Sequence, residues 1–242
     1  IPGFKGGDRE TIELPSIQSR LLAELKKAGK KIVFVNFSGS AIALTPETKT
    51  CDAILQAWYP GQAGGTAIAN VLFGDYNPAG RLPVTFYKST NQLPDFEDYS
   101  MKGRTYRYMT EAPLFPFGHG LSYTTFQYGN ASLNAPEIKD GEQVTLTIPV
   151  SNTGKYDGEE VVQVYLRRPG DKEGPSHALR AFKRVAIAKG TTNQVTIPLS
   201  KENFEWFDTG TNTMRPIEGE YEILYGGTSE LKQLKSIPVT IK

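Results

Sequence analysis

The sequence predicts two fold classes in succession, an α/β region with an incomplete sheet and an all-β sandwich after it. Three observations support this order. Helical and strand-like patterns alternate up to residue 87, a stretch without clear periodicity covers residues 88–130, and short strands separated by turns fill residues 131–242. Alternating helices and strands are typical of α/β architecture, and closely spaced short strands are typical of a sandwich. We therefore expect domains at 1–87 and 131–242, joined by a connector at 88–130.

The α/β region contains few elements. Apolar residues recur at helical spacing over residues 14–25, and Gly29 follows as a terminator. Residues 31–37 are rich in β-branched and aromatic side chains and predict a buried parallel strand. Residues 52–58 predict a second strand, and residues 64–73 predict a helix. Two strands with two or three helices cannot complete a doubly wound sheet, so we expect the sheet to be partial.

The last part of the chain alternates polar and apolar residues over short runs. Turn sequences such as Asn152-Thr153-Gly154 and Gly226-Gly227 separate these runs. Six strands are expected, at residues 143–150, 160–167, 181–188, 194–199, 221–225 and 236–241. Six or seven strands in about 110 residues are typical of an immunoglobulin or fibronectin type III sandwich.

The composition argues against several classes of binding partner and of catalytic site. The 242 residues include 27 Lys and Arg against 26 Asp and Glu, a net charge of +1, so neither nucleic acid nor an anionic membrane surface is an expected partner. No apolar run reaches the roughly 20 residues that span a bilayer. Only His119 and His177 are present, which argues against a histidine metal site or a Ser-His-Asp triad. A neutral sugar fits this composition better.

Four blocks of sequence resemble a known enzyme family. They are Ala-Trp-Tyr-Pro-Gly-Gln-Ala-Gly-Gly-Thr at 57–66, Leu-Phe-Gly-Asp-Tyr-Asn-Pro-Ala-Gly-Arg-Leu-Pro at 72–83, Gly-Arg-Thr-Tyr-Arg-Tyr at 103–108, and Pro-Phe-Gly-His-Gly-Leu-Ser-Tyr-Thr-Thr-Phe at 116–126. In this order and spacing they resemble the later part of family 3 glycoside hydrolases. The resemblance implies the second half of an α/β sandwich domain followed by a fibronectin type III-like domain. It also implies a (β/α)8 barrel, absent from this chain, against which the sandwich docks.

The resemblance places the catalytic carboxylates outside this chain. Retaining glycosidases use two carboxyl groups about 5–5.5 Å apart, and in this family the nucleophilic Asp lies on the barrel. The acid/base Glu lies shortly upstream of a segment that resembles Gly7-Asp8-Arg9, followed here by Leu14-Pro15 and Gln18. The chain is therefore expected to begin just after its acid/base residue. We expect no catalytic residue, no metal ligand and no cofactor site within it.

Carboxyl groups and aromatic rings within the chain could also act in catalysis or sugar binding. A structural role is favoured over catalysis for the carboxyl groups of the first part and the connector, which are Asp8, Glu10, Glu13, Asp75, Glu97, Asp98 and Glu111. Aromatic rings could stack on sugars, but packing is favoured for them as well. These rings are Trp58, Tyr59, Tyr99, Tyr106 and Tyr108, with Trp206 expected in the sandwich core. Substrate-binding residues therefore stay unassigned.

The leading hypothesis is the C-terminal part of a retaining, exo-acting β-glycosidase that removes terminal β-linked sugars from oligosaccharides and is inactive as this chain alone. Blocks 103–108 and 116–123 resemble the β-xylosidase branch slightly more than the β-glucosidase branch. The alternative is a non-catalytic docking or carbohydrate-binding module. A single cysteine, Cys51, excludes an internal disulfide. An enzyme that degrades polymers is expected in the periplasm or outside the cell.

Overall fold

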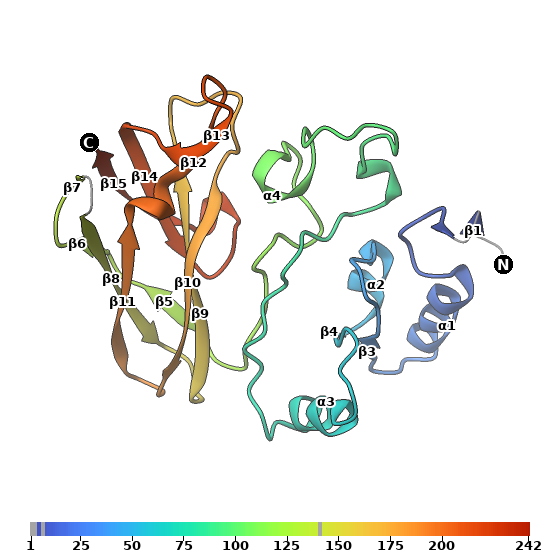
Figure 1. Ribbon diagram of the computed structural model, residues 1–242. Coiled ribbons are helices and arrows are strands. Elements are labelled where there is room, and N and C mark those ends of the chain that lie inside the picture. Colours follow the sequence, from blue (N-terminus) through green and yellow to red (C-terminus); the bar gives the residue numbers. More distant parts are fainter. Residues whose placement is uncertain (1–3, 6–7, 140–141) are drawn as a thin grey trace. The chain divides into compact units, whose positions relative to one another are not determined.

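The computed structural model describes residues 4–5, 8–139 and 142–242, which form two compact units (Figure 1). The chain passes back and forth between them rather than crossing once. The first unit contains Ile1–Tyr76, Val84–Thr105 and Met109–Pro116, and the second contains Asn77–Pro83, Tyr106–Tyr108 and Phe117–Lys242. Residues 88–130, expected as one connector, are thus divided between the units.

The first unit is an α/β arrangement, as the sequence predicts. Its elements are β1 (Phe4–Lys5), β2 (Asp8–Arg9), α1 (Ser16–Lys27), β3 (Val33–Asn36), α2 (Thr45–Thr50), β4 (Ala53–Gln56), α3 (Gly64–Phe73) and the 3-10 turn η1 (Thr90–Gln92). Strands β3 and β4 pair in parallel with Val33 opposite Ala53. Helix α2 was not predicted, because six residues are too few to show a helical period.

Local sequence explains where these helices begin and end. Pro46 stands in the first turn of α2, where its missing N–H has no intrahelical partner to lose. Helix α3 ends at Gly74, whose φ of 87° is the left-handed conformation that glycine adopts without a Cβ clash. Lys26 and Lys27 lie in the last turn of α1, where cations oppose the partial negative charge of the helix end. The predicted helix and strand positions are confirmed.

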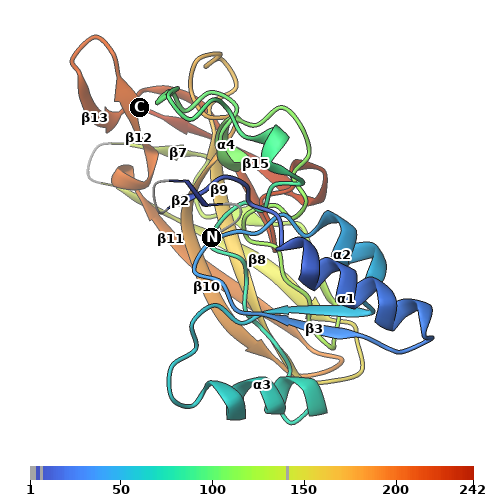
Figure 2. The same cartoon turned by 90° about the vertical axis from the view of Figure 1, so that its right-hand side faces the viewer.

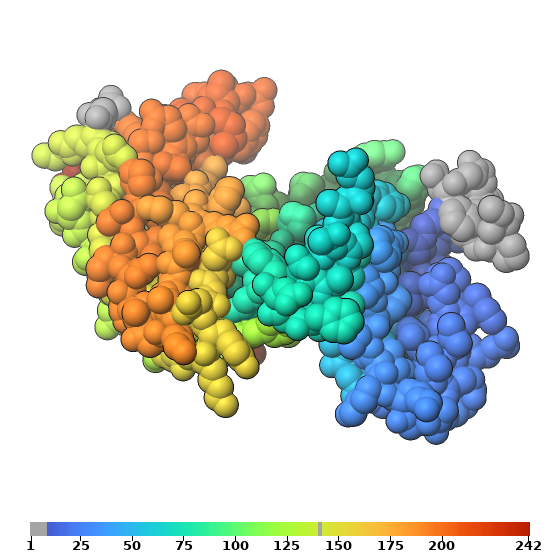
Figure 3. All heavy atoms as spheres, turned by 90° about the horizontal axis from the view of Figure 1, so that it is seen from below, coloured from blue at the N-terminus to red at the C-terminus, as the bar shows by residue number. Residues whose placement is uncertain are grey.

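The sheet of the first unit is partial, also as predicted. Among the described residues β3 pairs with β4 alone. Figure 2 shows α1 and α2 beside one another, and Figure 3 shows α1, in blue, at the surface. Ile17 and Leu21 of α1 are 59% and 60% exposed although they belong to its apolar stripe, whereas Leu22 is buried. The unit therefore exposes apolar side chains that are normally buried in a complete α/β domain.

The second unit is a two-sheet β-sandwich. One sheet has the order β10-β9-β14-β15-β7, and the other has the order β11-β8-β5 with β6 also paired to β8. Their bounds are β5 (Phe126–Tyr128), β6 (Ser132–Leu133), β7 (Glu137–Ile138), β8 (Gln143–Asn152), β9 (Gly158–Arg167), β10 (Ala178–Ile187), β11 (Thr192–Ser200), β14 (Gly219–Gly226) and β15 (Lys235–Ile241). A separate hairpin pairs β12 (Glu205–Asp208) with β13 (Thr213–Pro216). Short 3-10 turns η2 (Lys201–Phe204) and η3 (Leu231–Gln233) and the helical turn α4 (Thr105–Tyr108) complete the elements.

Alternation of side chains builds the core between the sheets. Strand β8 buries Val144, Leu146, Ile148 and Val150 on one face and leaves intervening residues partly exposed. The core also contains Trp206, which confirms the prediction for that residue. All six predicted strands are present with shifts of a few residues at their ends, which is the usual uncertainty of element boundaries.

Candidate functional site

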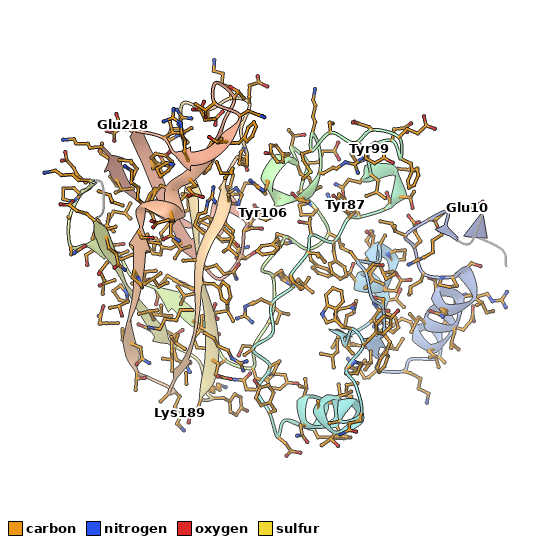
Figure 4. All side chains as sticks on the ribbon, viewed as in Figure 1. Glu10, Tyr87, Tyr99, Tyr106, Lys189 and Glu218 are labelled. Carbon is orange, nitrogen blue, oxygen red and sulfur yellow. The ribbon has the colours of Figure 1, made fainter. Side chains whose placement is uncertain are left out.

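One pocket of about 550 Å³ lies within the first unit and joins two segments far apart in sequence. One wall is residues 9–12, which begin at the last residue of β2, and the other is Thr90 with the loop that runs to Arg104. The loop contributes Leu93, Pro94, Phe96, Asp98, Tyr99 and Arg104. Figure 4 labels Glu10 and Tyr99, one from each wall. Of the carboxyl groups considered above, the pocket brings together Glu10 and Asp98.

Glu13 and Thr90 hold the two walls together. The Glu13 carboxylate accepts a hydrogen bond from the Thr90 amide at 2.8 Å and another from the Thr90 hydroxyl at 2.6 Å. The same hydroxyl accepts a bond from the Ile12 amide at 3.0 Å. Burial tends to raise the pKa of Glu13, but these hydrogen bonds favour the ionised form and the net pKa is lowered. Glu13 is therefore an ionised structural acceptor rather than a proton donor.

The loop from Pro94 to Arg104 is organised by its own polar groups. The Arg104 guanidinium donates to the carbonyl oxygens of Ser100, at 2.9 Å, Asp95, at 3.3 Å, and Asp98. Asp98 Oδ1 accepts from the Ser100 amide at 2.8 Å, and this backbone bond lowers the pKa of the Asp98 carboxyl. Asp95 Oδ1 accepts from the Glu97 amide at 2.9 Å. Both carboxylates shape the loop, and the lowered pKa of Asp98 does not suit that residue to donate a proton.

The remaining predicted carboxyl groups are not brought into a cluster. Asp75, Glu97 and Glu111 are exposed and do not line the pocket. Asp8 belongs to β2, and its side chain lies outside the described part of the structure. Within the part of the chain that the structure describes, no group of three or more His, Cys, Asp or Glu side chains could hold a metal ion.

The predicted aromatic residues fall in different environments. Tyr99 lines the pocket and is 91% exposed, whereas Trp58 is half-buried with its ring edge against Phe86 at 6.1 Å between centroids. Tyr59 is also exposed. Tyr106 and Tyr108 belong to the second unit, where Tyr106 stacks on Phe117 at 4.8 Å and is not available to the pocket. The expectation of packing thus holds for Tyr106 but not for Tyr99.

A polar network that sequence reasoning missed lies where β3 and β4 end. Asn36 Nδ2 donates to Gln56 Oε1 at 2.6 Å and to Ser38 Oγ at 3.0 Å, and Gln56 Nε2 donates to Ser38 Oγ at 3.1 Å. The carboxyl ends of parallel strands are where open α/β sheets commonly bind ligands. Here the polar side chains satisfy one another, and through Ser38 they brace the loop after β3. Polar residues at the ends of both predicted strands could have indicated this network.

The two histidines belong to the second unit. The His177 side chain is buried. Its Nε2 lies 2.9 Å from the Ser229 carbonyl oxygen, so Nε2 carries the proton, and Nδ1 lies 2.8 Å from the Ser176 hydroxyl. The His119 carbonyl oxygen accepts a bond from the Leu82 amide at 2.8 Å. These bonds support a structural role for His177.

Comparison with protein families gives two matches in sequence order. Residues 4–123 match the glycosyl hydrolase family 3 C-terminal domain, and residues 160–229 match the fibronectin type III-like domain. No helix among the described residues is long and apolar enough to cross a membrane.

Comparison with individual proteins points the same way. The chain is 58% identical to a xylan 1,4-beta-xylosidase of Xylanibacter ruminicola, an alignment that covers all of this chain and 28% of that protein. It is 35% identical to a periplasmic beta-glucosidase of Salmonella typhimurium, over 91% of this chain and 32% of the other. A solved β-glucosidase structure from Erythrobacter marinus matches the whole chain and 32% of its own, with a TM-score of 0.86 and 35% identity.

The chain spans about a third of the length of the curated relatives it matches. Both domain matches follow the order found from the sequence blocks, and the structure has the α/β unit and the β-sandwich that they require. The chain therefore belongs to glycoside hydrolase family 3, of which it contains the C-terminal domain and the fibronectin type III-like domain that follows.

Proposed function

We propose that this chain is the C-terminal part of a retaining, exo-acting β-glycosidase that releases terminal β-linked sugars, with β-xylosides favoured over β-glucosides. The observation that carries the proposal is the identity of 58% to a xylan 1,4-beta-xylosidase, maintained over the whole chain. Relatives at 35% identity include β-glucosidases, so the general class rests on more than one relative. The preference for xylose rests on the first relative and on the blocks at 103–108 and 116–123.

The catalytic carboxylates are proposed to lie on polypeptide outside this chain. A retaining mechanism needs a nucleophilic carboxylate and a second carboxyl that alternates between acid and base, about 5–5.5 Å from the first. An acid must hold its proton near the working pH, which requires a raised pKa. Hydrogen bonds lower the pKa of Glu13 and of Asp98 instead. Neither residue suits the acid/base role.

The first unit is proposed to dock against a (β/α)8 barrel that carries the nucleophile. Support comes from surface that this unit leaves open. The stripe of Ile17, Leu21 and Leu25 on α1 is exposed, as are Val33 at the start of β3 and Phe37 just after its end. Exposed apolar surface of this kind marks interaction sites. In the described ranges β3 pairs with β4 alone, so the outer edges of this pair are suited to pairing with further strands.

An exported location, in the periplasm or outside the cell, is proposed for the complete enzyme. A relative named as a periplasmic beta-glucosidase aligns over 91% of this chain. Export would also place the enzyme where oligosaccharides derived from polymers are found. Fractionation of the source cells, with detection of the polypeptide in periplasmic and cytoplasmic fractions, would test this location.

The activity is tested by hydrolysis of aryl β-xyloside and aryl β-glucoside. Two samples are compared, the longest encoded polypeptide that contains this sequence and the 242-residue chain alone, purified until no larger polypeptide remains. We expect turnover by the first only, and faster turnover of the xyloside. Turnover by the second would show that its own carboxyl groups are sufficient. If neither sample hydrolyses either substrate, the chain serves as a non-catalytic module.

A further inference from the structure

Two aromatic rings of the pocket are exposed to an unusual degree. Phe96 is 90% exposed and Tyr99 is 91% exposed, the highest values among the exposed large apolar side chains of the described residues. Leaving apolar area in water forfeits about 25 cal/mol per Å² of stabilisation. Both rings line the same pocket, within three residues of one another. Their exposure therefore suggests contact with a ligand rather than a role in folding.

The loop that carries these rings is held in shape without a ligand. Arg104 fixes the carbonyl groups of Asp95, Asp98 and Ser100, and two Asp side chains cap amides of the same loop. The opposite wall is fixed by the bonds between Glu13 and Thr90. A site formed before binding loses less conformational entropy when the ligand arrives.

The charges of the pocket indicate a neutral ligand. Its lining carries two cations, Arg9 and Arg104, and two anions, Glu10 and Asp98. The charges therefore cancel, and an anionic or cationic ligand would meet as much repulsion as attraction. Guanidinium groups donate hydrogen bonds and carboxylates accept them, so both kinds of partner are present for hydroxyl groups. A volume of about 550 Å³ lies within the range of small-molecule sites.

A pyranose ring combines the two surfaces that this pocket offers. Its C–H face is apolar and matches an aromatic ring, and its rim of hydroxyl groups both donates and accepts hydrogen bonds. We infer that the pocket binds one sugar ring of a neutral β-linked oligosaccharide, stacked on Phe96 and Tyr99 with its hydroxyl groups bonded by Arg9 and Glu10. The choice of a β-linked ligand rests on the proposed function, whereas the site itself rests on this chain's own residues.

Binding to the purified chain tests the site directly. The probes are the β-1,4-linked trisaccharides xylotriose and cellotriose, with the α-linked maltotriose for comparison. Saturation-transfer NMR reports which sugar protons lie against aromatic rings, and calorimetry gives the affinity. We expect saturable binding of a β-linked probe, with transfer to C–H protons of one ring. Replacing both Phe96→Ala and Tyr99→Ala should weaken association about tenfold, because the double variant removes both aromatic faces on which the sugar ring stacks.

Two matched variants make the test specific. Phe182→Ala removes another exposed ring, on strand β10 of the sandwich, and should leave binding unchanged. Phe96→Trp with Tyr99→Trp keeps aromatic faces and should keep binding. No saturable binding of either β-linked probe by the parent chain would overturn the inference, as would equal loss in Phe182→Ala. Hydrolysis by the complete enzyme is measured separately, so failure here does not depend on failure of the proposed activity.

A protein ligand would give a different result. If the rings form a surface that docks the remaining part of the enzyme, the Phe96→Ala and Tyr99→Ala chain should bind that part more weakly and should bind sugar as the parent does. Unchanged sugar binding in this variant would overturn the sugar site. Circular dichroism of each variant checks folding, and both replaced side chains are exposed, so we expect no change in the spectrum.

Discussion

A cluster of buried polar side chains attaches a loop segment of the second unit to its sheet. Arg81 and Glu160 form an ion pair at 2.6 Å with side chains 9% and 3% exposed, and the Tyr128 hydroxyl donates to the other Glu160 oxygen at 2.8 Å. This cluster ties the segment Asn77–Pro83 to strand β9. Residues 80–83, the end of the block at 72–83 that resembles the family, thus stabilise the second unit through Arg81.

Breaking this buried pair should be costly. Glu160→Gln leaves the Arg81 charge buried without its counter-ion, and loss of one partner of a buried pair costs about 3–5 kcal/mol. Glu159→Gln is the matched control, because the pair between Glu159 and Arg184 is partly exposed and should contribute less than about 1 kcal/mol. Urea unfolding of both variants measures the difference. Equal losses in the two variants would contradict the role given to burial.

The buried His177 should make stability depend on pH. Burial, with a contribution from nearby Arg167, lowers its pKa from 6.5 to about 4. The unfolded chain therefore binds a proton at a pH where the folded chain does not, so this contribution to stability is complete above about pH 6.5 and is lost as the pH falls towards 4.

Replacing this histidine should flatten the pH profile. His177→Gln is expected to lose less stability than the parent between pH 7 and pH 5, as measured by urea unfolding at each pH. Part of the decline should persist, because burial also lowers the pKa of His119. A decline as steep in His177→Gln as in the parent would show that His177 does not titrate in this range.

At the scale of elements, helix α1 is less buried, and strand β9 more buried, than an amphipathic element with one buried face. Helix α1 exposes part of its apolar stripe, whereas β9 buries residues of both faces from Val162 to Leu166. Its second face is covered within the second unit by Tyr106, whose ring lies 5.7 Å from that of Tyr165, and by Gly118, whose carbonyl accepts from Gln163. How far neighbouring residues bury an element thus differs between α1 and β9, although both contain a similar share of apolar residues.

Two neighbouring leucines of α1 separate these effects. Leu22→Ala should cost about 2 kcal/mol or more of unfolding free energy, since Leu22 is buried, whereas Leu21→Ala should cost about 0.5 kcal/mol or less because Leu21 is 60% exposed. Thermal unfolding followed by circular dichroism compares them. If Leu21→Ala is as damaging as Leu22→Ala, then the stripe is covered in solution.

At the scale of the whole molecule, the two units differ in how complete their cores are. The sandwich has a continuous core between two sheets, including Ile148, Ile223 and Trp206. The first unit has a two-stranded parallel sheet and an exposed helix face. Because burial of apolar area is the main stabilising contribution, the first unit should be the less stable.

We expect calorimetry to show two transitions, with the first unit unfolding at the lower temperature. Leu22→Ala should shift the lower transition by several degrees, and Ile148→Ala should shift the upper one. A single transition that both variants shift equally would indicate that the units unfold together. Addition of the remaining enzyme part should raise the lower transition if it covers the exposed stripe.

The sequence alone determined the order of the two fold classes and the positions of the main strands and helices, since periodicity and turn residues are local properties. It also identified the family through four blocks. The tertiary structure decided which aromatic rings are exposed and which distant segments meet. The pocket joins residues 9–12 to a loop about 80 residues later, and nothing in the local pattern around Phe96 or Tyr99 distinguishes a ring left in solvent from one such as Tyr106, which packs in the second unit. Contacts between segments distant in sequence depend on how the chain folds back, which the spacing of residues along it does not record.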